Sequence, residues 1–174
     1  MTKAIMNIAD VPLMEWGHGV DYPGAGKADP KFQARIGFIG NKIGARKLGY
    51  NITVVPAGKR AFPFHNHRAN EEMFFILEGS GEVRIGAERH PIRAGDVIAC
   101  PAGGAEAAHQ IINTSDGELR YLAVSTKITP EIADYPDTGR FGVLHEEPPA
   151  ADGTPRGLRF IGRADESLPY WEGE

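Results

Sequence analysis

Two histidines and two glutamates lie close together near the middle of the chain. His65 and His67 are one residue apart, and the adjacent Glu71 and Glu72 follow them directly before the apolar run MFFIL, residues 73–77. In a strand, residues two apart share a face, so the two imidazoles are expected to point the same way. Neutral imidazoles and a carboxylate that converge on one point are the ligands a divalent transition metal prefers.

Alternation does not show which glutamate faces the interior, because the run that follows is apolar on both faces. A buried carboxylate needs a cation or strong hydrogen-bond donors, so an inward glutamate would itself point to a bound ion. An isolated pair of histidines, however, is more often a surface feature that recurs by chance. A second stretch, GDVIACPAGGAEAAHQIIN at residues 95–113, adds a third histidine, His109.

The two stretches together resemble the two conserved motifs of the cupins. The first motif, G-(x)5-HxH-(x)3,4-E-(x)6-G, corresponds to Gly58, His65, His67, Glu72 and Gly79, with six residues instead of five after Gly58. The second motif, G-(x)5-PxG-(x)2-H-(x)3-N, corresponds to Gly95, Pro101, Gly103, His109 and Asn113, with five residues instead of two before the histidine. Both motifs occur in order, so the match is specific.

The resemblance implies a small jelly-roll β-barrel that holds one divalent transition metal ion per chain, such as Zn, Fe, Mn or Ni. Carried over residue by residue, the metal ligands would be His65, His67, Glu72 and His109. Such a set leaves positions of an octahedral ion open for water or substrate.

At two positions of the motifs, more than one residue is a candidate metal ligand. The family spacing also admits Glu71, but only Glu72 keeps six residues to Gly79, so Glu72 is preferred and Glu71 is expected on the outer face or behind a histidine. Glu106, not a histidine, stands at the strict family spacing in the second motif. The asparagine that follows four residues after His109 favours His109. If Glu106 binds instead, the site has two histidines and two carboxylates.

Short apolar or alternating runs separated by turn residues predict the elements that position these side chains. With 22 glycines and 13 prolines, long helices have little room. The strands are expected at residues 49–55, 73–77, 81–85, 96–99, 109–113 and 119–125, with turns between them, including IGAERH at 85–90. Close spacing of this kind is typical of an all-β sandwich or barrel.

One domain is expected, since 174 residues suffice for a single core. Its barrel would span about residues 48–127. Residues 1–47 read as an irregular N-terminal arm, with a possible strand at 35–39. Residues 128–174 read as a C-terminal extension, with short strands at 141–144 and 158–161, that wraps the barrel or a partner subunit.

Composition narrows the choice of partner and compartment. A net charge of −4 argues against nucleic acid or an anionic membrane as the main partner. The single cysteine, Cys100, rules out an internal disulfide framework and is expected as a packed apolar residue, compatible with the cytoplasm. No apolar run approaches the length of a membrane span or of a signal-peptide core. Open strand edges and long arms favour a homodimer.

The resemblance favours a metal-dependent enzyme acting on a small molecule, with sugar-phosphate isomerase and dioxygenase chemistry as near-equal options. An isomerase needs a base and a cation for phosphate, for which Glu71 or Glu106 and Arg60 or Arg140 are the candidates. A dioxygenase needs iron beside an apolar cavity, which Phe74, Ile76 and Ile111 could line. The alternative is a non-catalytic cupin that binds or senses a small ligand.

Overall fold

The computed structural model describes residues 4–21, 26–147, 150 and 156–173. These residues form β-strands and three short 3-10 helices and contain no α-helix, which confirms the all-β prediction. None of the helices among them is long or apolar enough to cross a membrane. The strands are β1 (Met14–Gly17), β2 (Gln33–Phe38), β3 (Leu48–Val55), β4 (Asn66–His67), β5 (Glu72–Glu78), β6 (Ser80–Ile85), β7 (Glu88–Arg93), β8 (Val97–Cys100), β9 (His109–Ile112), β10 (Leu119–Thr126), β11 (Glu131–Tyr135), β12 (Arg140–Glu147) and β13 (Arg156–Arg163). The helices are η1 (Ile8–Asp10), η2 (Gly40–Ile43) and η3 (Ala164–Glu166).

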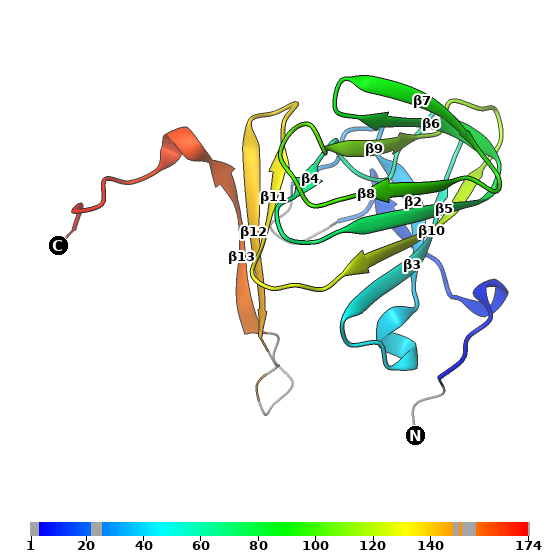
Figure 1. Ribbon diagram of the computed structural model, residues 1–174, viewed down its shortest axis with the longest axis horizontal. Helices are drawn as coiled ribbons and strands as arrows, with labels where there is room; N and C mark the ends of the chain where they lie inside the picture. Colours follow the sequence, from blue (N-terminus) through cyan, green and yellow to red (C-terminus); the bar gives the residue numbers. More distant parts are fainter. Residues whose placement is uncertain (1–3, 22–25, 148–149, 151–155, 174) are drawn as a thin grey trace.

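Two antiparallel sheets form the jelly-roll barrel (Figure 1). One has the strand order β1-β2-β3-β10-β5-β8 and the other has the order β7-β6-β9. Isolated bridges tie the segment before β4 to the smaller sheet, since Arg60 pairs with Ile112 and His65 pairs with His109. These bridges bring the residues of the first motif alongside β9.

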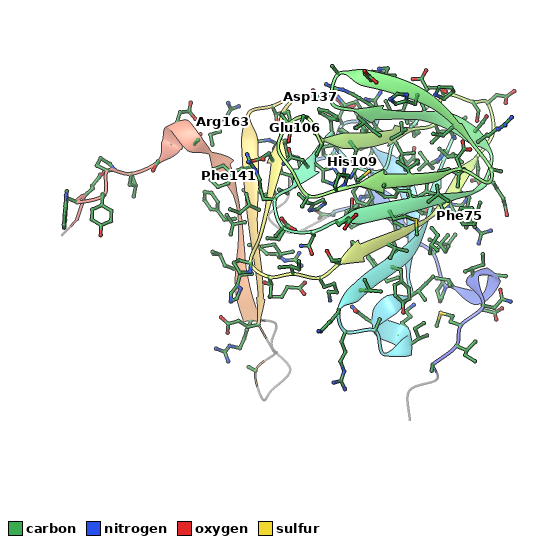
Figure 2. The ribbon with its side chains drawn as sticks, in the orientation of Figure 1. Phe75, Glu106, His109, Asp137, Phe141 and Arg163 are labelled. Atoms are coloured by element: carbon green, nitrogen blue, oxygen red, sulfur yellow. The ribbon has the colours of Figure 1, made fainter. Side chains whose placement is uncertain are left out.

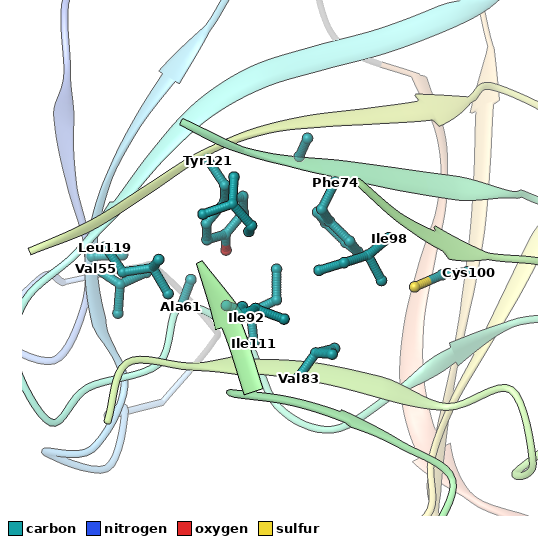
Figure 3. Close-up of a cluster of buried hydrophobic side chains, with 13 residues drawn as sticks. Val55, Ala61, Phe74, Val83, Ile92, Ile98, Cys100, Ile111, Leu119 and Tyr121 are labelled. Atoms are coloured by element: carbon teal, nitrogen blue, oxygen red, sulfur yellow. The ribbon is translucent and has the colours of Figure 1, made fainter. Parts of the chain in front are cut away.

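The core between the two sheets follows the two-residue period of the strands (Figure 3). On β5, Phe74 and Ile76 are buried, and on β10, Tyr121 and Ala123 alternate with partly exposed residues. Since Glu72 has the parity of Phe74 and Ile76, it lies on the inner face of β5. Register with β8 pairs Glu72 with the buried Cys100, which packs in the same core as predicted.

The N-terminal segment is more regular than expected. β2 confirms the strand predicted near residues 35–39 and pairs with β3, but β1 was not predicted and extends the large sheet by a further strand. A second apolar cluster forms on the outer face of this sheet, where Val11 and Ile39 pack on Ile52 and Val54 of β3. The N-terminal residues therefore cover one face of the large sheet.

The C-terminal extension and β4 form a third sheet, of order β13-β12-β11-β4, which stands across one end of the barrel (Figure 1, left). β12 and β13 include the two predicted short strands, whereas β11 was not expected. β11 pairs with β4, so that Ala133 lies opposite His67 and Asp134 opposite Asn66. The Asn66 Nδ2 donates to Asp134 at 2.8 Å, and Arg84 of β6 donates to Asp137 at 2.9 and 3.0 Å.

The turn predicted at residues 85–90 is wrong in its second half. Only Gly86 and its neighbour turn the chain, and residues 88–93 form β7, the outer strand of the small sheet. All residues of β7 except Ile92 are exposed, and His90 is one of them. The strand therefore lacks the alternation of apolar residues from which a strand is predicted.

Candidate metal centre

Four side chains from separate elements converge at the end of the barrel that faces the C-terminal sheet. His67 lies on β4, Glu72 begins β5, His109 begins β9, and His65 is fixed beside His109 by two backbone hydrogen bonds of 2.8 and 3.2 Å. We call these four residues the His/Glu cluster. Pairing between strands brings the two motifs together in space, although they are far apart in the sequence.

Distances within the His/Glu cluster are those of groups facing one point. The Glu72 Oε2 lies 2.9 Å from His109 Nε2 and 3.5 Å from His67 Nε2. The ring centroid of His65 is 5.0 Å from that of His67 and 4.9 Å from that of His109. One ligand atom from each of His65, His67 and Glu72 can be chosen so that all lie within 4.8 Å of one another, and this group could hold a metal ion.

Burial and neighbouring charges set the protonation of the cluster. Burial, aided by the nearby His109, lowers the pKa of His65 to about 4, so its imidazole is neutral at pH 7. Burial opposes ionisation of Glu72, but the hydrogen bond from His109 and the nearby imidazole of His67 outweigh it and hold the pKa of Glu72 well below its usual range. The pKa of His67 is raised, because its two neighbouring carboxylates outweigh the opposite effect of burial. The carboxylate of the cluster is thus deprotonated at neutral pH, which is the form in which a carboxylate binds a metal ion.

The residues present fit a divalent cation. Both ring nitrogens of His67 are buried without a hydrogen-bond partner, and their nearest carboxylate oxygens are 3.5 and 3.6 Å away, beyond ordinary hydrogen-bond length. Unpaired buried polar atoms are costly. A cation between His65, His67, Glu72 and His109 would pair the nitrogen that faces Glu72 and neutralise the buried carboxylate.

Two cavities reach the cluster from different sides. The inner cavity, of about 220 Å³, lies within the barrel and is mostly apolar and aromatic beyond the cluster; it is lined by Asn51, Phe62, Phe74, Gln110, Ile111, Tyr121 and Ala123. The outer cavity, of about 200 Å³, lies between the barrel and the C-terminal sheet. Beyond His67 and Glu72, its wall includes charged side chains, and it is made of Asn70, Ser125, Thr126, Lys127, Ile128, Thr129, Glu131, Leu144 and Glu146. The cluster is therefore accessible to a small molecule.

The remaining candidates lie outside both cavities. Glu71 is exposed on the outer face of the chain. Glu106 is also exposed, and its carboxylate accepts from the Gly104 N–H at 2.9 Å (Figure 2). Arg60 does not line the inner cavity but contacts a residue that does, because its guanidinium donates to Gln110 Oε1 at 3.2 Å. Arg140 lies over the ring of Tyr135, at 5.7 Å from its centroid.

Sequence reasoning missed the contribution of β11. Glu131 is a buried carboxylate 3.6 Å from His67 Nδ1, and the ring of Tyr135 stacks near His65 at 6.2 Å between centroids. Neither residue belongs to a motif with a recognisable spacing. The only signal was the presence of aromatic residues in a proline- and charge-rich segment.

Comparison with known proteins places this site in a family. Residues 51–125 match the profile of the cupin domain family. An uncharacterized protein of Methanocaldococcus jannaschii is 32% identical over 72 residues, which are 41% of this chain and 54% of that protein. The oxalate-binding protein of Thermotoga maritima is 37% identical over 60 residues, which are 34% of this chain and 47% of that protein. The chain thus spans about half the length of these curated relatives.

Solved structures extend the likeness to the whole chain. A candidate sugar phosphate isomerase of Acidithiobacillus ferrooxidans superposes with a TM-score of 0.75 at 19% identity and covers 96% of both chains. A sugar phosphate isomerase of the cupin superfamily from Silicibacter pomeroyi gives 0.71 at 24% identity and covers 95% of this chain and 97% of its own. A predicted oxalate decarboxylase of Thermotoga maritima gives 0.56 at 22% identity, over 71% of this chain and 99% of its own. The two sequence motifs, the barrel and the profile match agree that residues 51–125 form a cupin domain.

Proposed function

We propose that the chain is a metal-dependent enzyme that acts on a small, oxygen-rich substrate through one divalent transition metal ion, Zn, Fe, Mn or Ni, held by the His/Glu cluster. The observation that carries the proposal is the pair of buried ring nitrogens of His67 that have no hydrogen-bond partner, beside His65, His109 and the ionised Glu72. Buried polar groups without partners are rarely retained for stability alone. A bound ion would polarise a carbonyl or enediol oxygen of the substrate.

Lys127 is the one ammonium among the residues that line the outer cavity, and it could meet an anionic end of a substrate, as in isomerisation of a sugar phosphate. His67 and Glu72 are at the base of this cavity, and Lys127 and the hydroxyl of Thr126 are in its wall. A substrate that chelates the ion through two oxygens could place an anionic group near this ammonium. The two solved structures described as sugar phosphate isomerases share the fold over nearly the whole chain, including the C-terminal sheet that forms this wall, which supports the assignment.

A proton-transfer group would then come from the outer cavity. Its carboxylates, apart from Glu72, are Glu131 and Glu146. Glu131 is engaged by several backbone N–H groups, whereas Glu146 is half exposed and has Lys127 Nζ 3.6 Å away. We therefore assign the role of base to Glu146. None of Glu71, Glu106 and Arg60 lines this cavity, so none of them has this role in the proposal.

The test combines metal content with turnover. Protein purified without added metal, and then loaded with Fe, Mn, Zn or Ni in turn, is assayed by NMR against a panel of aldose and ketose phosphates. We expect isomerisation with at least one ion, and loss of both metal and turnover in His65→Ala/His109→Ala. In Glu146→Gln, turnover should fall by about 100-fold or more while metal content is kept, as for loss of a general base. Equal metal content in the double variant and the unmodified protein would contradict the metal site.

A non-catalytic binding role is the second candidate, because one observation favours it. Among the residues that line the inner cavity, Glu72 is the only carboxylate, and it is already engaged within the cluster, so that cavity offers no free base. The Thermotoga maritima relative is an oxalate-binding protein, and a small dicarboxylate of that kind can chelate an ion. Tight binding of oxalate without turnover of any panel member would favour this role. Oxygen uptake by the Fe form would instead favour a dioxygenase in the apolar inner cavity.

A further inference from the structure

Glu131 is a buried carboxylate in an unusual setting. Only 5% of its surface is exposed. Its Oε1 accepts from the backbone N–H of Arg68, Ala69 and Ile132 at 2.9–3.1 Å. Its Oε2 accepts from the Asn70 N–H at 2.8 Å and from the Asn70 side-chain amide. This many donors compensate the cost of removing a carboxylate from water, and they fix its two oxygens in space.

One of these fixed oxygens points to a residue of the His/Glu cluster. The Glu131 Oε2 lies 3.6 Å from Nδ1 of His67, while the Nε2 on the opposite edge of the same ring lies 3.5 Å from Glu72 Oε2. The imidazole of His67 therefore lies between two carboxylates, and neither of its nitrogens has a hydrogen-bond partner. Glu72 is the carboxylate on the side of the other cluster residues, and Glu131 is on the side of the C-terminal sheet.

We infer that Glu131 is a positioning residue for the metal site: it holds the proton of His67 on Nδ1, so that the Nε2 lone pair is directed at the ion. A metal-binding imidazole nitrogen must be unprotonated, and a carboxylate on the opposite nitrogen selects that tautomer and fixes the ring. The inference rests on the metal site of the proposed function but not on the reaction. It gives the C-terminal sheet a direct part in metal binding.

The fold explains why this carboxylate arrives at the right place. In the antiparallel pairing of β11 with β4, Ala133 lies opposite His67, so Glu131 lies next to the turn at residues 68–70. The Arg68 N–H donates to the Ile132 carbonyl at 2.8 Å and continues this pairing. A purely structural role, tying this turn to β11, is the alternative that the experiment must separate.

Asp134 supplies the matched control. It is a second carboxylate of β11 and joins the same two strands, since its Oδ2 accepts from Asn66 Nδ2 at 2.8 Å and from Arg68 Nε at 2.6 Å. It lines neither cavity and forms no described contact with a cluster imidazole. Asp134→Asn therefore loosens the same junction without removing the partner of His67.

The experiment measures zinc and cobalt affinity without substrate, by competition with a chelating dye, in the unmodified protein, Glu131→Gln and Asp134→Asn. We expect Glu131→Gln to weaken the affinity by about 10- to 100-fold, the usual effect of removing such a partner, and Asp134→Asn to change it by less than about threefold. Equal losses in the two variants, or no loss in Glu131→Gln, would overturn the inference. Because turnover is not measured, an inactive protein that still binds metal leaves the result intact and counts only against the proposed reaction.

The Glu131→Gln side chain also places an amide NH2 group among N–H donors, which can destabilise the fold. Thermal unfolding of the metal-free variants is therefore measured alongside the titration, to show that each variant is folded. A second measurement needs no variant. In zinc-loaded protein labelled with 15N-histidine, long-range correlation spectra should show His67 protonated at Nδ1 and bound to zinc through Nε2. Zinc on Nδ1, or a proton on Nε2, would overturn the inference.

Discussion

Glu72 shows how a single carboxylate can be both costly and necessary. It is one of the inward residues of β5, and its side chain is only 18% exposed. Burial would keep it protonated, but the imidazoles of His109 and His67 reverse that preference and lower its pKa. The result is a negative charge inside the barrel, surrounded by nitrogen donors. Such a charge is best balanced by a cation, which is the basis for the first prediction.

Glu72→Gln should abolish tight metal binding, whereas Glu71→Gln should not. The amide keeps the size of the side chain but removes the charge that attracts the ion, so we expect the zinc dissociation constant to rise by about 100-fold or more, beyond the loss caused by removing an indirect partner. Glu71 is adjacent in the chain but exposed on the opposite face. Competition titration of both variants measures this. Loss of metal from Glu71→Gln with retention in Glu72→Gln would contradict the assignment.

Cys100 should be unreactive in the folded protein. It is 2% exposed, and burial, with the charge of Glu72 in addition, raises its pKa to about 12 from the usual 9.0. At pH 8, a thiol reagent is expected to label it at least about 100-fold more slowly than in concentrated urea. Rapid labelling without denaturant would show that β8 opens or that the thiol is accessible.

The same pKa shift affects stability at high pH. Because the Cys100 thiol keeps its proton in the folded state and loses it in the unfolded state, its contribution to the free energy of unfolding falls as pH rises from 9 towards 12. Below pH 9 it has no such effect.

At the scale of elements, the single residue that joins β5 to β6 keeps Glu72 in register. Gly79 joins β5 to β6 with a φ of 81°, and a Cβ at this position would collide with the carbonyl oxygen of Glu118. Only glycine adopts this conformation beside a backbone atom without strain. The register of β5, and with it the inward position of Glu72, thus depends on this residue.

Gly79→Ala should therefore destabilise the fold. We expect a loss of about 2 kcal/mol or more in the free energy of unfolding, from the positive φ and the steric collision together. Gly117→Ala is the control, because a Cβ at Gly117 would have nothing within 4 Å and its φ is not in the left-handed region. Urea unfolding of the metal-free proteins gives both values. Similar urea midpoints for the two variants would mean that the connection between β5 and β6 can move to accommodate the Cβ with little loss of stability.

The elements that were predicted are those whose burial leaves a pattern in the sequence. β3, β5 and β10 alternate or run apolar and were placed within two residues of their observed ends. β7 was missed because it is an outer strand with a single buried residue, Ile92, so no period is visible. β11 was missed for a related reason, since its buried side chain is a carboxylate, Glu131, which reads as surface.

The candidate site was predictable only where chemistry is encoded by spacing. The motifs located the four residues of the His/Glu cluster, and the structure brings these together. That they bind a metal ion stays a prediction, for which the metal titrations are the test. Spacing could not reveal Glu131, whose donors include Asn70, 61 positions away along the chain. Its place depends on the pairing of β11 with β4, a tertiary contact with no local signal. The same holds for Tyr135 beside His65.

At the scale of the whole molecule, the C-terminal extension and the barrel together enclose the outer cavity. The third sheet closes the end of the barrel where the cluster lies, and it lines the outer cavity with Leu144 and Glu146 (Figure 1). The ion pair between Arg84 and Asp137 fastens its β11–β12 turn to the barrel, and Figure 2 labels Asp137 in this turn. The shape of the outer cavity is therefore set partly by residues outside the family profile, which ends at residue 125.

The same sheet leads to the expectation that the chain forms a homodimer. β13 pairs with β12 on one side, and its other edge is the edge of the sheet. Its apolar side chains are exposed, with 53% for Leu158, 48% for Phe160 and 62% for Ile161. Exposed apolar residues beside an unpaired strand edge are commonly covered by another chain. A second copy of this chain, which brings the same surface, would cover both at once.

Light scattering on the full chain should therefore give twice the 18.9 kDa monomer mass. Phe160→Glu places a charge on the exposed face of β13 and should shift the mass to that of a monomer, because burying an unpaired carboxylate at an interface is costly. Leu48→Glu is the matched control, since Leu48 is similarly exposed, at 46%, but lies on the large sheet at the start of β3. A monomer mass for the unmodified chain would contradict the dimer. A monomer in Leu48→Glu with a dimer in Phe160→Glu would instead move the interface to the large sheet and leave β13 exposed.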